Sequence, residues 1–325
     1  MAAPTGTYQT YQQVGIREDL ADKIYDISPT ETPFMTMCKV GKKAANTKVE
    51  WQTDALAAAD ATNAVIEGDD ATTDTASPTS RLSTHTQIMD KVIRVSETAQ
   101  AINAAGRKKE LAYQIAKRSK ELKRDMEARL TGNYASSAGS AAAARTTAGV
   151  EAWLETNTSR GTGGSDGGYN TSTGVVDAAT DASTSNWRTF TESQLKSVIK
   201  SCWENGGEPN IIMVGASNKQ TASGFGGIAT QYRDNRRVGP ASIIAAADVY
   251  VSDYGEFKIV PNRFSRDRSA LVLDMEYWEL RYLQPFNISP LAKTGHSERR
   301  LLRAEFALCS KNEGASGIVA DLTVS

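Results

Sequence analysis

Residues 97–130 read ETAQAINAAGRKKELAYQIAKRSKELKRDMEARL and carry the clearest periodic pattern of the chain. Apolar side chains recur there at helical spacing and form one narrow stripe, made of Leu111, Ile115, Leu122, Met126 and Leu130. Lys117 with Glu121, and Lys123 with Glu127, have the spacing of ion pairs on the other side of the helix. Gly132 is suited to end the helix, and Gly106 to bend or break it. A continuous helix would be about 50 Å long, and so narrow a stripe predicts that it lies across a surface.

The residues before this helix predict a long two-stranded ribbon over 46–95. Residues 48–52, KVEWQ, alternate polar and apolar side chains as a half-buried strand does. Strand character returns from Gln87 to Val95, after a stretch at 54–80 that is mostly Ala, Thr and Asp. Because a two-stranded ribbon is only marginally stable alone in water, the pattern indicates that another surface supports it.

Two further stretches lack a strong helical or strand pattern. Residues 1–45 predict an arm with one short helix around Gly15 to Ile27, and an extended or turning segment at 28–34 that contains Pro29 and Pro33. Residues 131–186 are dominated by Ala, Ser, Thr and Gly. Ordering a backbone residue costs about 1–2 kcal/mol, so this segment is expected to be ordered only where other chains hold it.

Residues 187–325 predict a region that mixes helices and strands. Residues 191–194, TESQ, form a capping box that starts a helix. Its predicted buried side carries Leu195, Val198, Ile199, Cys202 and Trp203, and Gly206 and Gly207 end it. A short buried strand is predicted at 210–215, and further strands at 248–251, 257–260, 270–273 and 300–308. Tyr277 and Trp278 are expected to pack in a core beside a strand.

No residue pattern in the chain is typical of a catalytic, cofactor or metal site. His85 and His296 are the only histidines, and no serine or cysteine stands in a nucleophile turn of the GxSxG kind. No glycine motif that binds phosphates opens a helix, and the acidic residues between 54 and 74 lack the ligand spacing of a calcium loop. Cys38, Cys202 and Cys309 are predicted to be reduced and unbridged. The protein is therefore predicted not to be an enzyme.

The composition gives no sign of a membrane segment or of an overall attraction to nucleic acid. The formal net charge is -1. The first residues lack the pattern of a signal peptide, and no stretch approaches the 18 or so apolar residues of a membrane helix. The basic groups at 107–109 and 117–120 either contact phosphate or form the solvated face of the long helix, and the second interpretation is favoured.

The C-terminal third carries a series of blocks in a fixed order. Residues 248–255 read DVYVSDYG, and they are followed by FKIVPNR at 257–263, ALVLD at 270–274, LRYLQPF at 280–286, LAKTGHS at 291–297, RAEFAL at 303–308 and EGASG at 313–317. This order of blocks resembles the SU-ten-type family of tailed-bacteriophage major capsid proteins, which share the HK-ninety-seven fold. No single block is specific by itself, and the resemblance rests on their order.

The resemblance implies an α+β fold with an N-terminal arm, an extended β-ribbon loop, a peripheral domain with a long spine helix, and an axial domain. The predicted boundaries are 1–45 for the arm, 46–95 for the ribbon loop, 96–132 for the spine helix, 133–186 for an insertion, 187–255 for the axial domain, and 256–325 for the remaining axial strands and the return to the peripheral domain.

The resemblance also implies a function in assembly. The family forms pentamers and hexamers that close an icosahedral shell around double-stranded DNA, and it needs no cofactor. The expected location is the virion, after assembly in the bacterial cytoplasm. Portal, scaffolding and cement or decoration proteins are candidate partners besides the chain itself. Contacts between subunits are predicted at Val49, Trp51, Ile88 and Ile93 of the ribbon. Arg233, Arg236 and Arg237 either pair with carboxylates of a neighbouring subunit or are simply exposed.

Other classes of protein remain as alternatives. An encapsulin-like compartment shares the fold but encloses an enzyme as cargo. An α/β hydrolase is disfavoured because histidine is scarce and the nucleophile turn is missing. A phage tail or decoration protein is disfavoured because such proteins usually lack a long helix followed by an α/β region.

Overall fold

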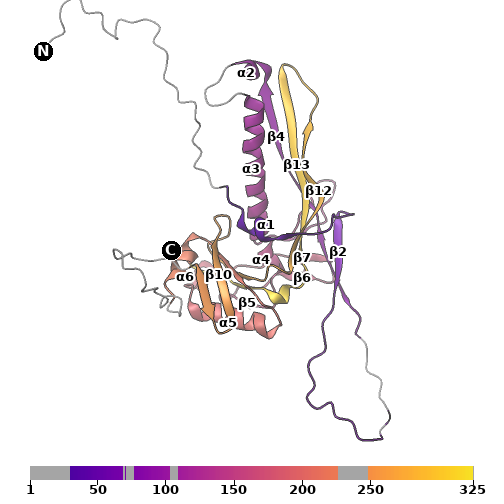
Figure 1. The fold of residues 1–325 in the computed structure, drawn as a ribbon, viewed down its shortest axis with the longest axis vertical. Helices are drawn as coiled ribbons and strands as arrows, with labels where there is room; N and C mark the ends of the chain where they lie inside the picture. Colours follow the sequence, from indigo (N-terminus) through magenta and orange to yellow (C-terminus); the bar gives the residue numbers. More distant parts are fainter. Residues whose placement is uncertain (1–29, 69, 71–76, 103–108, 226–247, 325) are drawn as a thin grey trace, which may run out of the picture.

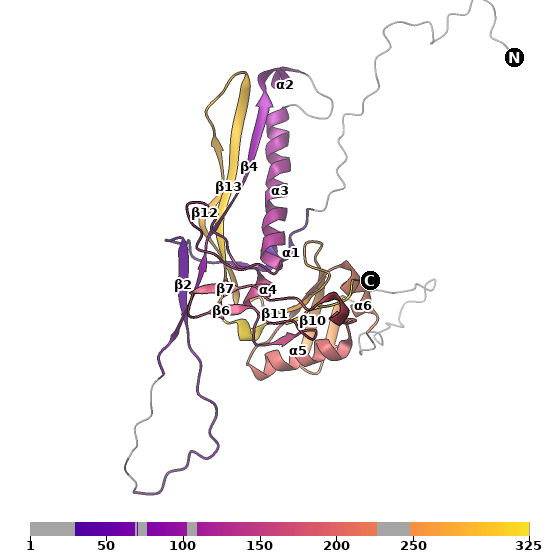
Figure 2. The ribbon, with the colours of Figure 1, turned by 180° about the vertical axis from the view of Figure 1, so that it is seen from behind.

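A computed structural model of the protein describes residues 30–68, 70, 77–102, 109–225 and 248–324. The chain forms an elongated half and a more compact half, which meet at one core (Figure 1). A narrow ribbon leaves the body beside this junction, and its tip stands clear of both halves in the front and rear views (Figure 2). The predicted mixture of helices and strands is confirmed.

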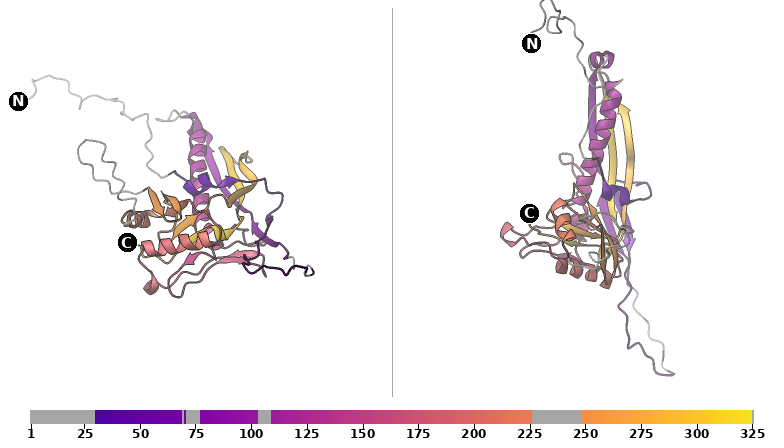
Figure 3. Two further views of the ribbon diagram at one scale, coloured as in Figure 1. Left: turned by 60° about the horizontal axis from the view of Figure 1, so that its bottom comes forward. Right: turned by 60° about the vertical axis from the view of Figure 1, so that its left-hand side comes forward.

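The elongated half consists of a sheet and one long helix. The sheet has the order β1-β12-β13-β4, with β1 at Lys39–Val40, β12 at Trp278–Pro290, β13 at Ser297–Ser310 and β4 at Gln87–Ser96. Helix α3, Glu110–Thr131, lies along one face of this sheet, so that helix and sheet form two layers (Figure 3). Ile93 and Val95 of β4 are buried on the side of the helix.

The long helix is shorter and less uniform than its periodicity suggests. A separate helix α2 occupies Glu97–Ala101, and α3 begins at Glu110. At 22 residues, α3 is about 33 Å long. Leu122, Met126 and Leu130 of the predicted stripe are buried, and the helix ends at Gly132 as predicted.

The predicted ion pairs of α3 are wrong. Glu121 pairs with Arg118 at 2.5 Å, one turn away, and Glu127 is fully buried. The periodicity places Glu127 next to the buried stripe, and the tertiary fold supplies the donors that a carboxylate needs there.

The compact half contains a mixed sheet with the order β5-β14-β11-β8-β10-β9. Its strands are β5 at Thr158–Ser159, β8 at Ile211–Val214, β9 at Val249–Ser252, β10 at Gly255–Pro261, β11 at Ala270–Leu273 and β14 at Gly317–Val319. Helix α5, Glu192–Glu204, packs on it through Leu195, Val198, Ile199 and Cys202. The short helix α6, Ala216–Ser223, follows β8.

Several predictions for this half are confirmed, and one is corrected. The capping box at Thr191 and Gln194 is present, and β8, β9, β10 and β11 lie where strands were expected. Trp203 was predicted on the buried side of α5, but it is 57% exposed and contacts Tyr254. The sheet also includes β5, which comes from the Gly-rich stretch before residue 187.

Thr191→Ala is expected to lower the free energy of unfolding by about 1 kcal/mol. The Thr191 hydroxyl accepts the N–H of Gln194, and the Gln194 side chain accepts the N–H of Thr191. Loss of such a cap costs about 0.5–2 kcal/mol. Urea unfolding of the unassembled subunit measures the change. Ser193→Ala, at an exposed position of the same turn, is the control, and equal effects of the two substitutions would contradict the role of the cap.

The ribbon pairs differently from the prediction. Its strands are β2, Lys48–Thr53, and β3, Ser80–His85, in antiparallel register. The predicted return strand, Gln87 to Val95, is instead β4 and pairs with β13. The chain changes sheet at Thr86, whose N–H bonds to the carbonyl of Thr47 at 2.8 Å and whose hydroxyl donates to Glu305 at 2.7 Å.

The Ala-, Ser-, Thr- and Gly-rich segment is anchored within its own subunit. It contains α4 at Val150–Trp153, β6 at Gly168–Asn170, β7 at Val175–Asp177 and a 3-10 turn at Thr184–Asn186, besides β5. Val150, Trp153, Leu154 and Val176 are buried in the core that both halves share. The expectation that only other chains could order this segment is therefore wrong, because a few large side chains anchor it.

The remaining differences lie at the junction of the halves. The expected helix around Gly15 to Ile27 lies outside the described residues. The described residues 30–32 are neither helix nor strand, as expected for the segment 28–34, but its last two residues begin a short helix α1, Pro33–Met37. A 3-10 turn occupies Glu313–Ala315. β12 was not predicted as a strand, but Trp278 at its start is fully buried as expected, and its indole N–H donates to the Ser316 hydroxyl at 3.0 Å.

Candidate assembly surfaces

The base of the ribbon is fixed to the body by aromatic packing. The rings of Trp51 and Trp153 lie 5.7 Å apart, and those of Trp153 and Tyr169 are stacked at 6.3 Å. Ser83 of β3 bonds to the Tyr169 hydroxyl at 3.0 Å and donates to the carbonyl of Gly174 at 2.9 Å. The ribbon therefore leaves the body at a defined place and direction.

The tip of the ribbon exposes aliphatic side chains. Leu56 is 99% exposed, and Val65 and Ile66 are each more than three-quarters exposed. Isolated exposed aliphatic residues are ordinary on protein surfaces. These three, however, lie on an extended loop whose described part stands clear of the body in Figure 1, which makes them a candidate contact surface.

The predicted contact residues fall into three groups. Val49 and Ile93 are buried inside the subunit at 6% and 3% exposure, so the expectation that a neighbour covers them is corrected. Trp51 is half-buried against the core, and Ile88 is exposed. Arg233, Arg236 and Arg237 lie outside the described residues.

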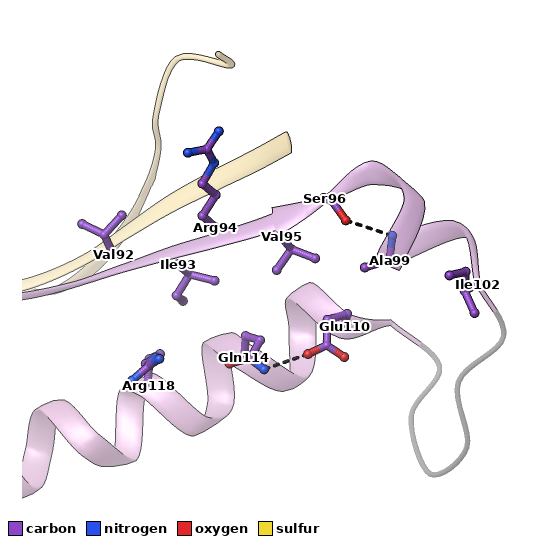
Figure 4. A pocket seen from close by; sticks show the side chains of 10 residues that line it. All are labelled: Val92, Ile93, Arg94, Val95, Ser96, Ala99, Ile102, Glu110, Gln114 and Arg118. Carbon is purple, nitrogen blue, oxygen red and sulfur yellow. Dashed lines mark hydrogen bonds between the residues drawn. The ribbon is translucent and has the colours of Figure 1, made fainter. Parts of the chain in front are cut away.

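The face of the four-stranded sheet that points away from α3 is uncovered around Val92 of β4, and we call this part the open face. Nearer the junction of the halves the same face is covered, because Ala307 and Cys309 of β13 pack against Val49. Figure 4 shows Val92 and Arg94 of β4 pointing away from α3, while Ile93 and Val95 point toward it. Directly opposite residues of an antiparallel pair share a face. The register therefore adds Arg303, Leu301 and Arg299 of β13, opposite Asp90, Val92 and Arg94.

A cleft of about 520 Å³ lies between β4, α2 and the first turns of α3. Figure 4 shows Glu110, Gln114 and Arg118 of α3 on one side of it and β4 on the other. β4 is the edge strand of its sheet, so one row of its backbone groups faces out along this cleft. Ile102, beside it, is 60% exposed.

A buried carboxylate anchors the segment that follows the N-terminal stretch. Glu127 of α3 accepts the backbone N–H groups of Phe34 and Met35 at 2.8 and 2.9 Å. It also accepts the side-chain amide of Asn262 at 2.7 Å. Burial raises the pKa of the Glu127 carboxyl, and these three donors oppose that rise. Glu127 thus joins α1, α3 and the end of β10 at the junction of the two halves.

A second buried carboxylate anchors residues 131–186, the segment rich in Ala, Ser, Thr and Gly, which we call the Gly-rich segment. Glu151 of α4 lies 3.2 Å from the Arg266 guanidinium and accepts the Ser269 hydroxyl. Arg266 also pairs with Asp181 at 2.5 Å. Burial raises the pKa of Glu151, and the Arg266 charge opposes this. These contacts join residues 151 and 181 of the segment to the loop before β11.

No chemistry-bearing cluster is found in the part of the chain that the structure describes. The described residues contain no group of three or more His, Cys, Asp and Glu side chains that could hold a metal ion. Burial raises the pKa of Cys202 and of Cys309 to about 12, so these thiols are not nucleophiles near neutral pH. Burial also lowers the pKa of His85, with Lys48 and Arg145 adding to the effect. None of the described helices is long and apolar enough to cross a membrane.

The open face was not predicted from the sequence. Val92 and Arg94 alternate with buried neighbours in β4, so a period of two was visible. The residues that complete the face, Arg299, Leu301 and Arg303, are about 200 positions away in the chain. No local pattern could have brought them together.

The comparisons with known proteins agree with this fold. The family model described as "SU10 major capsid protein" matches residues 3–323. The major capsid protein of Escherichia phage Phieco32 is 31% identical over 98% of this chain and 97% of its own length. A solved structure of the cyanophage A-1(L) capsid asymmetric unit aligns over 97% of this chain and 99% of its own chain, with 10% identity and a TM-score of 0.65. A solved "capsid of native GTA particle computed with C5 symmetry" aligns over 95% of this chain and 96% of its own, with 11% identity and a TM-score of 0.59.

Proposed function

The chain belongs to the SU10 major capsid protein family, and from that premise we propose that its copies form the pentamers and hexamers of an icosahedral shell around double-stranded DNA. It is a structural component of the phage virion and not an enzyme. The single observation that carries the proposal is the match over residues 3–323 to a capsid family, together with a relative similar in length.

The parts of the fold receive the following roles in this proposal. The ribbon β2–β3 with residues 54–79 is the extended loop, and α3 is the spine helix of a peripheral domain that also contains the four-stranded sheet. The six-stranded sheet with α5 and α6 is the axial domain at the capsomer centre. The first 45 residues form the arm. This assignment is supported by the elongated shape of one half and the compact shape of the other (Figure 1).

Many weak contacts would hold such a shell together. A contact with a millimolar dissociation constant provides about 4 kcal/mol. If the ribbon reaches one neighbour and the arm another, each subunit takes part in several such contacts, and their effects combine through multivalency. The fivefold symmetry of the similar particle supports pentamers at the vertices. Portal, scaffolding and decoration proteins remain candidate partners.

The first test is whether the expressed protein assembles. We expect electron micrographs of the purified chain to show closed shells, or capsomers of five and six subunits. A well-behaved monomer under all assembly conditions would contradict the proposal. Particles from infected cells are expected to contain double-stranded DNA, whereas an enzyme as cargo would favour an encapsulin-like compartment.

A further inference from the structure

The solvent side of α3 carries lysines whose expected ion pairs are not formed. The spacing of the sequence pairs Lys117 with Glu121 and Lys123 with Glu127, which describes a solvated face of balanced charge. Glu121 pairs instead with Arg118, and Glu127 is buried against α1. The two lysines are therefore left without the carboxylates that were expected to balance them.

The exposed side chains of α3 are few and mostly basic. The exposed residues of the helix are three lysines, two alanines and one aspartate: Lys117, Lys120, Lys123, Ala112, Ala116 and Asp125. Asp125 pairs with Lys91 of β4 at 2.5 Å, whereas no described carboxylate forms an ion pair with the three lysines. Lys109, the residue before the helix, is exposed as well. We call Lys109, Lys117, Lys120 and Lys123 the lysine face.

The acidic side chains of α3 lie on another side of the helix. An α-helix turns by about 100° per residue, so the lysine face occupies about a third of its circumference. Glu110 and Arg118 line the cleft beside β4 (Figure 4), and Arg118 holds Glu121. Asp125 reaches a lysine of β4 itself. The negative charges of α3 therefore point toward β4, and its unbalanced positive charges point to solvent.

Helix α5 shows the arrangement that a solvated helix face usually has. Its exposed lysines are balanced one turn away, Lys196 by Glu192 at 2.8 Å and Lys200 by Glu204 at 3.3 Å. On the lysine face, by contrast, neighbours along the helix are both cations, and like charges at such spacing destabilise a helix. The row extends for about 20 Å from 109 to 123. An anionic partner would relieve this repulsion.

A linear polyanion fits the lysine face better than a protein surface does. Protein interfaces have an apolar core, and the only apolar side chains exposed on α3 are Ala112 and Ala116. The ribbon tip, whose charged residues at 54–79 are all acidic, would bring Leu56, Val65 and Ile66 to a helix without large exposed apolar side chains. Double-stranded DNA carries one charge about every 1.7 Å of its length and requires only cations from its partner.

We propose that the lysine face lies on the inner surface of the shell and binds the phosphate backbone of the packaged DNA. The inference rests on the proposed function and specifies which side of the subunit turns toward the DNA. Because α3 and the four-stranded sheet form two layers (Figure 3), the open face then turns outward. Lysine contacts to phosphate carry no sequence information, so the binding is the same for every stretch of the genome.

Binding of a random-sequence DNA duplex to the unassembled full-length subunit tests the chemistry. The triple change Lys117→Gln, Lys120→Gln, Lys123→Gln is expected to weaken binding at least about tenfold at 0.1 M salt. It should also make the plot of log affinity against log salt less steep by about 3, since each phosphate contact contributes about 0.9 to the slope. Fluorescence anisotropy of the labelled duplex measures both quantities. Glutamine and lysine have similar helix propensities, so the helix should be kept.

A control of equal charge removes lysines that have partners within the subunit. Lys196 and Lys200 pair with glutamates of α5, and Lys293 pairs with Glu97. The triple change of these three lysines to glutamine is expected to leave both the affinity and the salt slope near wild type. Equal losses in the two triple variants, or no loss in the first, would contradict the proposal.

Acylation of lysines in wild-type particles tests the location. A small acylating reagent that penetrates the shell is applied to DNA-filled particles and to the same particles after release of their DNA, and mass spectrometry measures each lysine. Lys117, Lys120 and Lys123 are expected to react several-fold more slowly in the filled particles. Lys196 and Lys200 should react alike in both. Equal reactivity of the lysine face in the two samples would overturn the proposal, and so would protection found only in precursor shells without DNA, which would indicate an acidic protein.

The outcomes separate this inference from the proposed function. If the wild-type chain forms no shells at all, the proposed function fails. If shells form and enclose DNA, but the lysine face reacts equally with and without it, only the present inference fails. Should the triple glutamine variant not fold, which a thermal unfolding scan of the subunit would reveal, the acylation of wild-type particles alone decides.

Discussion

Deletion of residues 55–79 is expected to leave a folded subunit that cannot form a heat-stable shell. The described residues of the deleted stretch, 55–68, 70 and 77–79, are all exposed, and Leu56, Val65 and Ile66 are its large apolar side chains. The ribbon strands β2 and β3 keep all their pairs except Thr53–Ser80, which must open so that the chain can turn through Asp54. Trp51 keeps its contact with Trp153. The free energy of unfolding of the isolated subunit should therefore change by less than about 1 kcal/mol, as surface changes usually do.

The effect on the shell should be much larger, because the same contact is lost in every subunit. Losing even a millimolar contact removes about 4 kcal/mol per subunit. Electron microscopy and the temperature of shell disruption measure the result. A variant in which 55–79 is replaced by a Gly/Ser linker of equal length is the matched control, since it keeps the reach of the loop but removes its charged and aliphatic side chains. Shells of the deletion variant that form and withstand heating like wild type would show that the ribbon does not bridge subunits.

Trp153→Ala is expected to destabilise the subunit by about 3–5 kcal/mol, the usual cost of removing a large buried aromatic side chain. Trp153 is 1% exposed and lies between Trp51 of the ribbon and Tyr169 of the Gly-rich segment. Its removal opens a cavity where three parts of the chain meet. Urea unfolding of the unassembled subunit measures the loss.

The same substitution should also loosen the base of the ribbon. Protease cleavage near β2 and β3 is expected to become faster in Trp153→Ala. Trp203→Ala is the matched control, because Trp203 is 57% exposed and its removal should cost less than about 1 kcal/mol. If Trp153→Ala were no more destabilising than Trp203→Ala, the anchoring role of Trp153 would be wrong.

Local patterns in the sequence correctly predicted several helices and strands. The stripe through Leu122, Met126 and Leu130 predicted the side on which α3 is buried. The capping box at Thr191 predicted where α5 begins. The family was visible in the order of the C-terminal blocks, and the family comparison confirms it. Each of these depends on residues close together in the chain.

The contact residues were less predictable from the sequence. The alternation in β2 predicted a half-buried strand, yet Val49 is covered by the body of its own subunit, in a cluster with Ala307 and Cys309. Periodicity reports which side of an element is buried but not what covers it. A contact within the subunit and a contact with a neighbour leave the same pattern in the sequence.

Only the tertiary structure decided how the ribbon, the Gly-rich segment and Glu127 are arranged. The stretch 87–95 had the stronger strand pattern, but its partner is β13, so the weaker stretch 80–85 closes the ribbon. The Gly-rich segment is held by a few large side chains and by the Glu151–Arg266 pair. The sequence by itself determined most of α3, the start of α5, about half of the strands and the family, because these follow from local spacing and block order. The pairing of β4 with β13 and the open face depend on residues about 200 positions apart, and only packing brings them together.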